Sequence, residues 1–254
     1  MKNFWQNKTV LITGINGFIG SNLAKYLLKN NAKIYGLIRK IDKNTLLFYE
    51  KLDKKINLFY GDVTDIQLIK RIINEENINH IFHLAAQVEV GIAMKYPFST
   101  FESNVKGTYS ILEAARTSAS KINSIIVASS DKSYGEYPGS KLPYKESYPL
   151  NPKFFYDTSK ACADMISKSY ASNPRKPLPI IITRFANIFG PGQLNFSALI
   201  PDCIRSSLRY TIFEPRGNGE DTRDFLYVED VAEIYELLAR QLSQNKKLSR
   251  HIFN

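Results

Sequence analysis

The apolar positions of this chain fall into short runs that alternate with stretches of helical periodicity. The run Val10 to Ile12 contains β-branched residues and has no polar member, which is typical of a strand buried on both faces. From Leu23 to Leu28 the apolar positions recur at helical spacing. The chain therefore begins with a predicted strand, a short turn and a predicted helix.

The same alternation continues along most of the chain. Strands that alternate with helices at this rhythm predict an α/β fold with a Rossmann-type, doubly wound parallel sheet. We predict one main domain, residues 1–187 with 224–254, and assign the less regular residues 188–223 to part of a small substrate-binding lobe. The later predicted strands are 33–38, 57–60, 79–84, 124–128 and 180–183, with another beginning at 251, and the later predicted helices are 66–74, 97–116, 156–170 and 230–242.

Three glycines occupy the turn between the first strand and the first helix. Gly14 can take the tight turn out of the strand, and Gly17 lets backbone approach a pyrophosphate. Gly20 lets the helix pack closely against the strand, and the N–H groups at the helix start face the phosphates. The pattern predicts dinucleotide binding, and an ordinary strand-to-helix turn is the alternative.

The end of the second strand bears on the choice of cofactor. An Asp or Glu there would take the ribose hydroxyls of NAD, whereas this sequence has Arg39 followed by Lys40. A guanidinium suits the 2′-phosphate of NADP, so we expect NADP, with NAD as the alternative. Two basic residues also suit a solvated loop. Asp62, after the third strand, is either an acceptor for the adenine amino group or a turn residue.

Tyr156 and Lys160 lie four residues apart on a predicted helix and share one face. An ammonium near the phenol favours the phenolate, so we expect Lys160 to lower the pKa of Tyr156. Such a tyrosine can take a hydroxyl proton while hydride leaves the same carbon.

A second polar cluster directly follows the strand 124–128. The carboxyl ends of parallel strands are where open α/β sheets bind ligands. Ser130 can hydrogen-bond a substrate hydroxyl beside Tyr156, and Asp131 is a candidate general acid. The alternative is a serine-rich turn in which Asp131 and Lys132 are surface charges.

Composition limits the classes of partner. Of the 254 residues, 44% are hydrophobic and 23% are charged, which is ordinary for a globular protein. The net charge of +10 suits nucleic acid or a phosphorylated metabolite, but the basic residues are spread along the chain without an arginine-rich arm. We therefore expect a solvated basic surface and no nucleic-acid partner.

Neither metal binding nor a membrane location is predicted. Cys162 and Cys203 match no metal or redox spacing, and His80 and His83 point to opposite faces of their strand. The N-terminus lacks the apolar stretch of a signal peptide, and no run of about eighteen apolar residues occurs. We expect a cytoplasmic protein without a membrane partner.

Taken together, four motifs resemble the extended short-chain dehydrogenase/reductases, in particular the NAD(P)-dependent epimerases and dehydratases of nucleotide sugars. The resemblance extends from Val10 to Asn254. Its motifs are Thr13-Gly14-Ile15-Asn16-Gly17-Phe18-Ile19-Gly20, Leu84-Ala85-Ala86-Gln87, Tyr156-Asp157-Thr158-Ser159-Lys160 and Arg184-Phe185-Ala186-Asn187.

The resemblance implies roles for particular residues. Ser130, Tyr156 and Lys160 would form the catalytic triad, with Asn104 fixing Lys160 through water. The residues expected to bind substrate are Gln87, Ser130, Asn187 and Arg223, of which Asn187 and Arg223 match positions that touch the diphosphate. The residues expected to bind the cofactor are Gly14, Asn16, Gly17, Phe18, Ile19, Gly20, Arg39, Asp62, Val63, Leu84, Ala85, Ala86, Gln87, Asn104, Tyr156 and Lys160.

The resemblance also indicates a reaction. Ser130-Asp131-Lys132 is similar to the motif of CDP-glucose 4,6-dehydratase-like members, whereas Arg39 resembles the NADP-using GDP-mannose 4,6-dehydratases. We expect a 4,6-dehydratase that converts a nucleotide-linked hexose to its 4-keto-6-deoxy sugar, with Asp131 as the acid. Whether Lys132 is the base stays open. A 4-epimerase or reductase of the same family is the alternative, and a non-catalytic cofactor-binding protein is another.

Two further expectations follow from the resemblance. Members of this family commonly pair through two helices, so we expect a homodimer through helices 97–116 and 156–170. Members also usually continue past the strand that begins at His251, so we expect the lobe to be incomplete at its C-terminal end.

Overall fold

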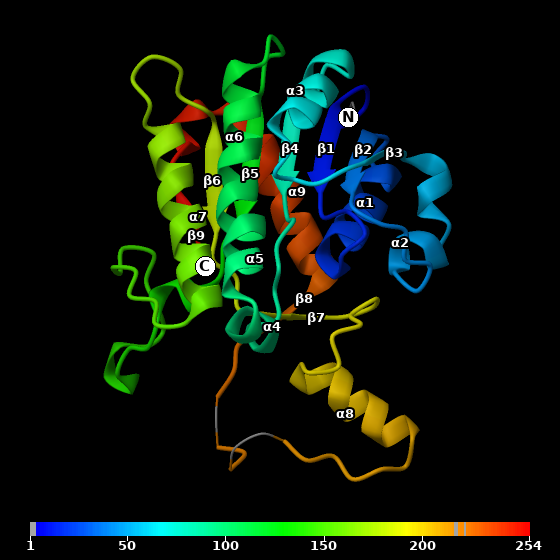
Figure 1. The fold of residues 1–254 in the computed structure, drawn as a ribbon, viewed down its shortest axis with the longest axis vertical. Coiled ribbons are helices and arrows are strands. Elements are labelled where there is room, and N and C mark those ends of the chain that lie inside the picture. Colours follow the sequence, from blue (N-terminus) through cyan, green and yellow to red (C-terminus); the bar gives the residue numbers. More distant parts are fainter. Residues whose placement is uncertain (1–3, 216–217, 221) are drawn as a thin grey trace.

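The computed structural model describes residues 4–215, 218–220 and 222–254 (Figure 1). Within these residues, seven strands form one sheet in the order β3-β2-β1-β4-β5-β6-β9, and every neighbouring pair is parallel. This confirms the predicted Rossmann-type, doubly wound α/β fold. The strands of this sheet are β1 (Thr9–Thr13), β2 (Lys33–Ile38), β3 (Asn57–Tyr60), β4 (His80–His83), β5 (Ser124–Ala128), β6 (Ile180–Thr183) and β9 (Ile252–Phe253).

Alternate residues of the buried strands pack into two apolar cores, one on each face of the sheet. Val10 and Ile12 belong to the core on one face, and Leu11 belongs to the core on the other. Helices α1 and α9 supply the first core, and α3, α6 and α7 supply the second. The helices of the described chain are α1 (Phe18–Lys29), α2 (Leu46–Tyr49), α3 (Ile66–Glu75), α4 (Val90–Lys95), α5 (Pro97–Phe101), α6 (Gly107–Thr117), α7 (Phe155–Ala171), α8 (Leu199–Leu208) and α9 (Val228–Gln244).

The predicted helix over residues 97–116 is present but not uniform. Its middle, Glu102–Lys106, is π-helical and joins α5 to α6. The buried Asn104 lies in this segment. A single π turn changes the helical period only locally, so the apolar pattern does not reveal it.

The described residues of the segment 188–223 are not part of the main sheet. A small parallel pair, β7 (Asn187–Phe189) and β8 (Phe225–Tyr227), flanks the segment, and α8 lies away from the sheet (Figure 1). The division into a main domain and a substrate lobe stays a prediction. The predicted domains include residues 1–3, 216–217 and 221, which lie outside the described residues.

The two histidines of β4 are buried on opposite faces of the sheet. The ring of His80 packs 4.9 Å from that of Trp5, and its Nδ1 lies 2.7 Å from Ser124 Oγ. His83 lies between the hydroxyls of Thr13 and Thr108, at 2.9 and 3.1 Å. Burial lowers the pKa of each histidine to about 3.

We therefore expect the free energy of unfolding to fall as the pH drops from about 6.5 towards 3. In that window the unfolded chain protonates both histidines and the folded chain does not, which costs about 1.4 kcal/mol per pH unit for each one. Urea unfolding of the His83→Gln variant at several pH values should show a shallower slope. His251→Gln, at an exposed position, is the matched control. An unchanged slope in His83→Gln would contradict this.

Among the helices of the described segments, none combines the length and the apolar composition that a membrane crossing requires.

Candidate active site

The turn from β1 into α1 is shaped by three glycines that leave little room for a side chain. Gly14 has φ +71°, and a Cβ there would lie 2.8 Å from backbone atoms of Ala85. A Cβ on Gly20 would overlap the carbonyl oxygen of Gly14. Gly17 is the N-cap of α1 and makes no capping hydrogen bond, so the cap residue itself leaves the amides of the first helical turn to another partner. This turn has the features that a pyrophosphate cradle requires.

A cavity of about 430 Å³ lies beside this turn, at the carboxyl ends of the central strands. It therefore lies where an open α/β sheet binds its ligands. Many of the predicted site residues come together in its wall. They are Gly14, Asn16, Gly17, Phe18, Ile19, Gly20, Arg39, Val63, Leu84, Ala85, Ala86, Ser130, Tyr156 and Lys160.

The other predicted site residues are not among the described residues that line the cavity. Two of them, Asp131 and Lys132, directly follow Ser130 in the chain. Sequence reasoning in turn missed several lining residues. The predicted residues outside the wall are Asp62, Gln87, Asn104, Asp131, Lys132, Asn187 and Arg223, and the missed lining residues include Thr13, Ser103, Ser129, Phe185, Gln193, Asn195 and Tyr235.

Ser130, Tyr156 and Lys160 all line this cavity. Ser130 begins the short 3-10 helix Asp131–Tyr134, and its Oγ accepts a hydrogen bond from the amide of Lys132 at 3.2 Å. Lys160 is buried on α7, and its Nζ donates to the carbonyl oxygen of Ala128 at 2.9 Å. Burial lowers the pKa of Lys160 to about 8.

The pKa of Tyr156 is shifted in the direction opposite to the sequence prediction. Burial raises it to about 12, although a side-chain hydrogen bond with Ser130 acts to lower it. The charges of Asp131 and Asp157 add to the increase. The prediction that Lys160 lowers the pKa of Tyr156 is therefore wrong. Burial disfavours the charged forms of both the phenol and the ammonium, and the Lys160 ammonium is bonded to Ala128.

Asp131 and Lys132 begin the short 3-10 helix that Ser130 caps. Asp131 is half-buried, and its Oδ1 accepts a hydrogen bond from Ser130 Oγ at 3.0 Å. The Lys132 side chain is exposed, and its charge acts to lower the pKa of the buried Asp157, which desolvation raises. The acid that we predicted is therefore in direct contact with the predicted catalytic serine.

Asn104 is held by partners other than Lys160. Its Oδ1 accepts from the Gln87 amide at 2.7 Å, and its Nδ2 lies 2.9 Å from the Gln87 carbonyl oxygen. The same Nδ2 lies 2.8 Å from Ser159 Oγ. Asn104 thus ties the loop after β4 to α7, and its water-mediated role towards Lys160 stays a prediction.

Arg39 and Asp62 face each other across the ends of β2 and β3. Arg39 Nη1 and Asp62 Oδ2 are 3.9 Å apart, and both side chains are well exposed. Asp62 Oδ1 also accepts from the Thr64 amide at 2.9 Å, so Asp62 does serve as a turn residue. Arg39 belongs to the cavity wall, as a phosphate-binding role requires.

The two residues expected to touch the substrate diphosphate lie near β7 and β8. Asn187 is exposed and donates through Nδ2 to the carbonyl oxygen of Asp224 at 3.1 Å. Arg223 is exposed and bonds the carbonyl oxygen of its neighbour Thr222 at 3.2 Å. Neither residue is among the described residues that line the cavity: Asn187 begins β7, and Arg223 precedes β8 by two residues.

In comparisons with known proteins, the matching family model and two similar proteins are described as 4,6-dehydratases of nucleotide sugars. The family described as GDP-mannose 4,6 dehydratase matches residues 11–250. The dTDP-D-glucose 4,6-dehydratase of Dictyostelium discoideum is 32% identical over 248 residues, which cover 91% of this chain and 55% of that protein. The CDP-glucose 4,6-dehydratase of Salmonella typhimurium is 30% identical over 213 residues, covering 81% and 59%. The chain thus spans little more than half the length of these two relatives.

Solved structures agree on the fold. A dTDP-glucose 4,6-dehydratase from Bacillus anthracis in complex with NAD superposes with a TM-score of 0.81 at 26% identity, covering 96% of this chain and 74% of that one. The UDP-glucose 4-epimerase of Thermotoga maritima with UDP-glucose also gives a TM-score of 0.81 at 26% identity, covering 91% and 72%. Dehydratases and epimerases therefore share this architecture.

Proposed function

The chain belongs to the GDP-mannose 4,6 dehydratase family, and on that premise we propose that it is a nucleotide-sugar 4,6-dehydratase with a bound nicotinamide cofactor. One observation carries the proposal: Ser130, Tyr156 and Lys160 line the same cavity as the glycine turn after β1. A proton-transfer group and a dinucleotide site thus meet in one space. The 4,6-dehydratases among the similar proteins support this reaction.

The glycine turn fits a dinucleotide, because side chains at Gly14 and Gly20 would collide with backbone that forms the cradle. The bound cofactor would supply a hydride acceptor and donor and, when oxidised, a positive charge in the cavity. The residues that would hold it are the glycines with Arg39, Val63, Leu84 and Lys160.

The protein side chains would supply positioning and proton transfer. Tyr156 takes the proton of the C4 hydroxyl of the hexose, and Ser130 hydrogen-bonds the same oxygen. Transfer of the C4 hydride to the cofactor would leave a 4-keto group, which acidifies the C5–H bond so that water can leave across C5 and C6. Asp131 protonates the departing C6 hydroxyl. The base that removes the C5 proton stays open, because the exposed ammonium of Lys132 must lose a proton before it can accept one. Return of that hydride to C6, with a proton to C5, would give the 4-keto-6-deoxy sugar.

An Asp131→Asn variant separates this proposal from its main alternative. A dehydratase should lose water elimination by about 10²- to 10⁴-fold, because the general acid is gone. A 4-epimerase should keep its activity, since inversion at C4 needs no acid at this position. Mass spectrometry of the reaction mixture over time measures how much 4-keto-6-deoxy product each variant forms. Glu136→Gln is the matched control, because Glu136 is an exposed carboxylate of the same loop, paired with Lys153.

The 4-epimerase is the second candidate function, and one observation favours it. Asp131 is not among the described residues that line the cavity, whereas Ser130, Tyr156 and Lys160 are. These three side chains with a cofactor suffice for inversion through a keto intermediate. Full activity of Asp131→Asn as a 4-epimerase would decide in favour of this candidate.

We propose NADP as the preferred cofactor, with NAD as the alternative. Arg39 in the cavity wall supports a 2′-phosphate contact, and NAD in the Bacillus anthracis relative supports the alternative. Arg39→Ala should weaken NADPH binding about 10- to 100-fold, as expected for the loss of a charge-assisted hydrogen bond, and leave NADH binding unchanged. Fluorescence titration measures both. Lys40→Ala is the neighbouring control, and tighter binding of NADH than of NADPH by the unaltered protein would contradict the proposal.

A homodimer through α5, α6 and α7 stays a prediction. The exposed Phe98 of α5 and Met165 of α7, at 78% and 61% exposure, support it. A contiguous patch of such side chains is typical of a protein–protein interface, whereas single exposed ones are common on any surface.

A further inference from the structure

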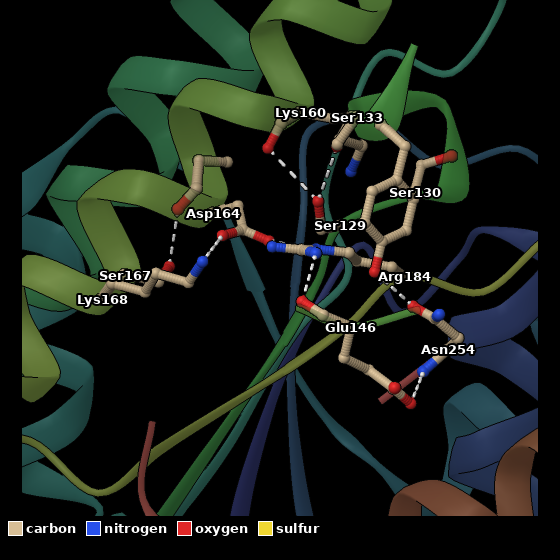
Figure 2. Close-up of polar contacts among 12 residues, drawn as sticks. Ser129, Ser130, Ser133, Glu146, Lys160, Asp164, Ser167, Lys168, Arg184 and Asn254 are labelled. Atoms are coloured by element: carbon tan, nitrogen blue, oxygen red, sulfur yellow. Dashed lines mark hydrogen bonds and ion pairs between the residues drawn. The ribbon is translucent and has the colours of Figure 1, made fainter. Parts of the chain in front are cut away.

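Behind the candidate active site, an arginine and an aspartate form an ion pair that is closed to solvent. Arg184 Nε donates to Asp164 Oδ2 at 2.7 Å, and both side chains have no exposed surface (Figure 2). Asp164 lies on α7, one helical turn after Lys160 and two turns after Tyr156. All three therefore lie along the same face of one helix.

Arg184 directly follows β6 and is fixed at its backbone as well. Its amide donates to the carbonyl oxygen of Phe253 at 2.8 Å, which continues the pairing of β6 with β9. Its Nη1 donates to the carbonyl oxygen of Glu146 at 3.3 Å (Figure 2). Arg184 thus contacts the sheet through its backbone, and α7 and the loop after β5 through its guanidinium.

The guanidinium also lies over an aromatic ring. Its Cζ is 4.6 Å from the ring centre of Tyr134, which is buried. The Tyr134 hydroxyl donates to Asn254 Oδ1 at 2.7 Å, and the Tyr144 ring stacks on Tyr134 at 4.8 Å. Tyr134 is the last residue of the short helix that Ser130 caps. Arg184 therefore bridges the helix that carries Tyr156 and Lys160 to the turn that carries Ser130.

We propose that Arg184 is a positioning residue. Its guanidinium, held between Asp164 and Tyr134, keeps the Ser130 hydroxyl where it can hydrogen-bond to Tyr156. The inference rests on the proposed function, which gives Ser130 and Tyr156 their catalytic roles. A guanidinium, unlike an ammonium, can donate in fixed directions to Asp164 and Glu146 while its charge lies over the Tyr134 ring.

The energetics favour a geometric role over a purely stabilising one. A buried ion pair can often be replaced by well-packed apolar residues without loss of stability, because desolvation offsets the attraction of the charges. What an apolar pair cannot reproduce is the fixed direction of the guanidinium hydrogen bonds. A second link, from Ser129 Oγ to the Lys160 carbonyl oxygen at 3.2 Å, joins the same two segments but does not reach Tyr134 (Figure 2).

The test follows the hydrogen bond between Ser130 and Tyr156 directly. Protein labelled with carbon-13 at the tyrosine Cζ gives an NMR resonance for Tyr156, assigned with Tyr156→Phe, and Ser130→Ala gives the reference shift for loss of the bond. We expect Arg184→Lys to move the Tyr156 resonance most of the way to the Ser130→Ala position. With an active nucleotide sugar, kcat should fall about 100-fold and KM should stay unchanged, as expected for a misplacement of about 1 Å.

Lys168→Gln is the matched control. Lys168 Nζ lies 3.1 Å from the other oxygen of the same Asp164 carboxylate, but its side chain is 40% exposed. Exposed ion pairs contribute little, so the Tyr156 resonance and kcat should stay at their values in the unaltered protein. An equal displacement in Lys168→Gln and Arg184→Lys would overturn the proposal.

A paired apolar variant, Asp164→Leu with Arg184→Met, covers the case in which Arg184→Lys does not fold. It removes both buried charges and should fold, with the Tyr156 resonance displaced as in Ser130→Ala. A Tyr156 resonance at the position of the unaltered protein, in either folded variant, would overturn the proposal. If the unaltered protein turns over no nucleotide sugar, the proposed function fails, and the resonance still decides whether Arg184 positions Ser130.

Discussion

A Tyr156→Phe variant should lose turnover of its nucleotide sugar by about 10²- to 10⁴-fold, the usual contribution of a general acid–base group. The phenol is the group that takes the C4 hydroxyl proton, and the structure puts it in the cavity wall beside Ser130 and Lys160. The change removes one oxygen atom and keeps the ring. Cofactor affinity, measured by fluorescence titration, should therefore change little, while the rate of product formation falls.

Tyr170→Phe is the control on the same helix. Its hydroxyl donates to Glu113 Oε2 at 3.0 Å, and burial raises the pKa of Tyr170 to about 12, as it does for Tyr156. Tyr170 is not among the described residues that line the cavity. Its loss should leave turnover unchanged. Comparable rates for Tyr156→Phe and Tyr170→Phe would remove Tyr156 from the mechanism.

A Gly20→Ala variant should lose most of its cofactor affinity. Alanine is the better helix former by about 1 kcal/mol, so helix propensity alone would favour the change. The added Cβ would nevertheless overlap the carbonyl oxygen of Gly14 and lie 2.8 Å from Ile15 Cα. Backbone must move to relieve this, at a cost of about 1–3 kcal/mol in stability, and the moved backbone is the cradle for the pyrophosphate. Thermal unfolding and cofactor titration measure the two effects.

Gly91→Ala provides the comparison for this change. Gly91 lies in α4, and a Cβ there would meet no atom of the described residues within 4 Å. The same substitution should leave cofactor affinity unchanged and stabilise the helix slightly. If Gly20→Ala binds the cofactor as tightly as Gly91→Ala does, the close approach at Gly20 has no role in binding.

The sequence predicts the sheet well because its signal is local. The first strand is a short apolar run, so the alternation of Val10, Leu11 and Ile12 between two cores follows from the pattern alone. The π segment around Asn104 is not visible in that pattern, because one wide turn leaves the apolar periodicity on either side intact.

The site is predicted only where one segment supplies it. The glycine turn and the spacing of Tyr156 and Lys160 are local, and the structure brings them to one cavity. Tyr235 lines the same cavity from α9, outside every motif, so nothing in the motifs indicates it. The direction of the Tyr156 pKa shift was also out of reach, because it depends on burial by the whole fold.

The central claim is that a proton-transfer tyrosine and a dinucleotide cradle serve one hexose ring. Its most direct test is incubation of the protein and NAD(P) with a panel of CDP-, GDP-, UDP- and dTDP-linked hexoses, followed by mass spectrometry of the products. We predict that one nucleotide sugar yields a 4-keto-6-deoxy product lighter by one water molecule. Cofactor binding without any such product, across the whole panel, would contradict the account.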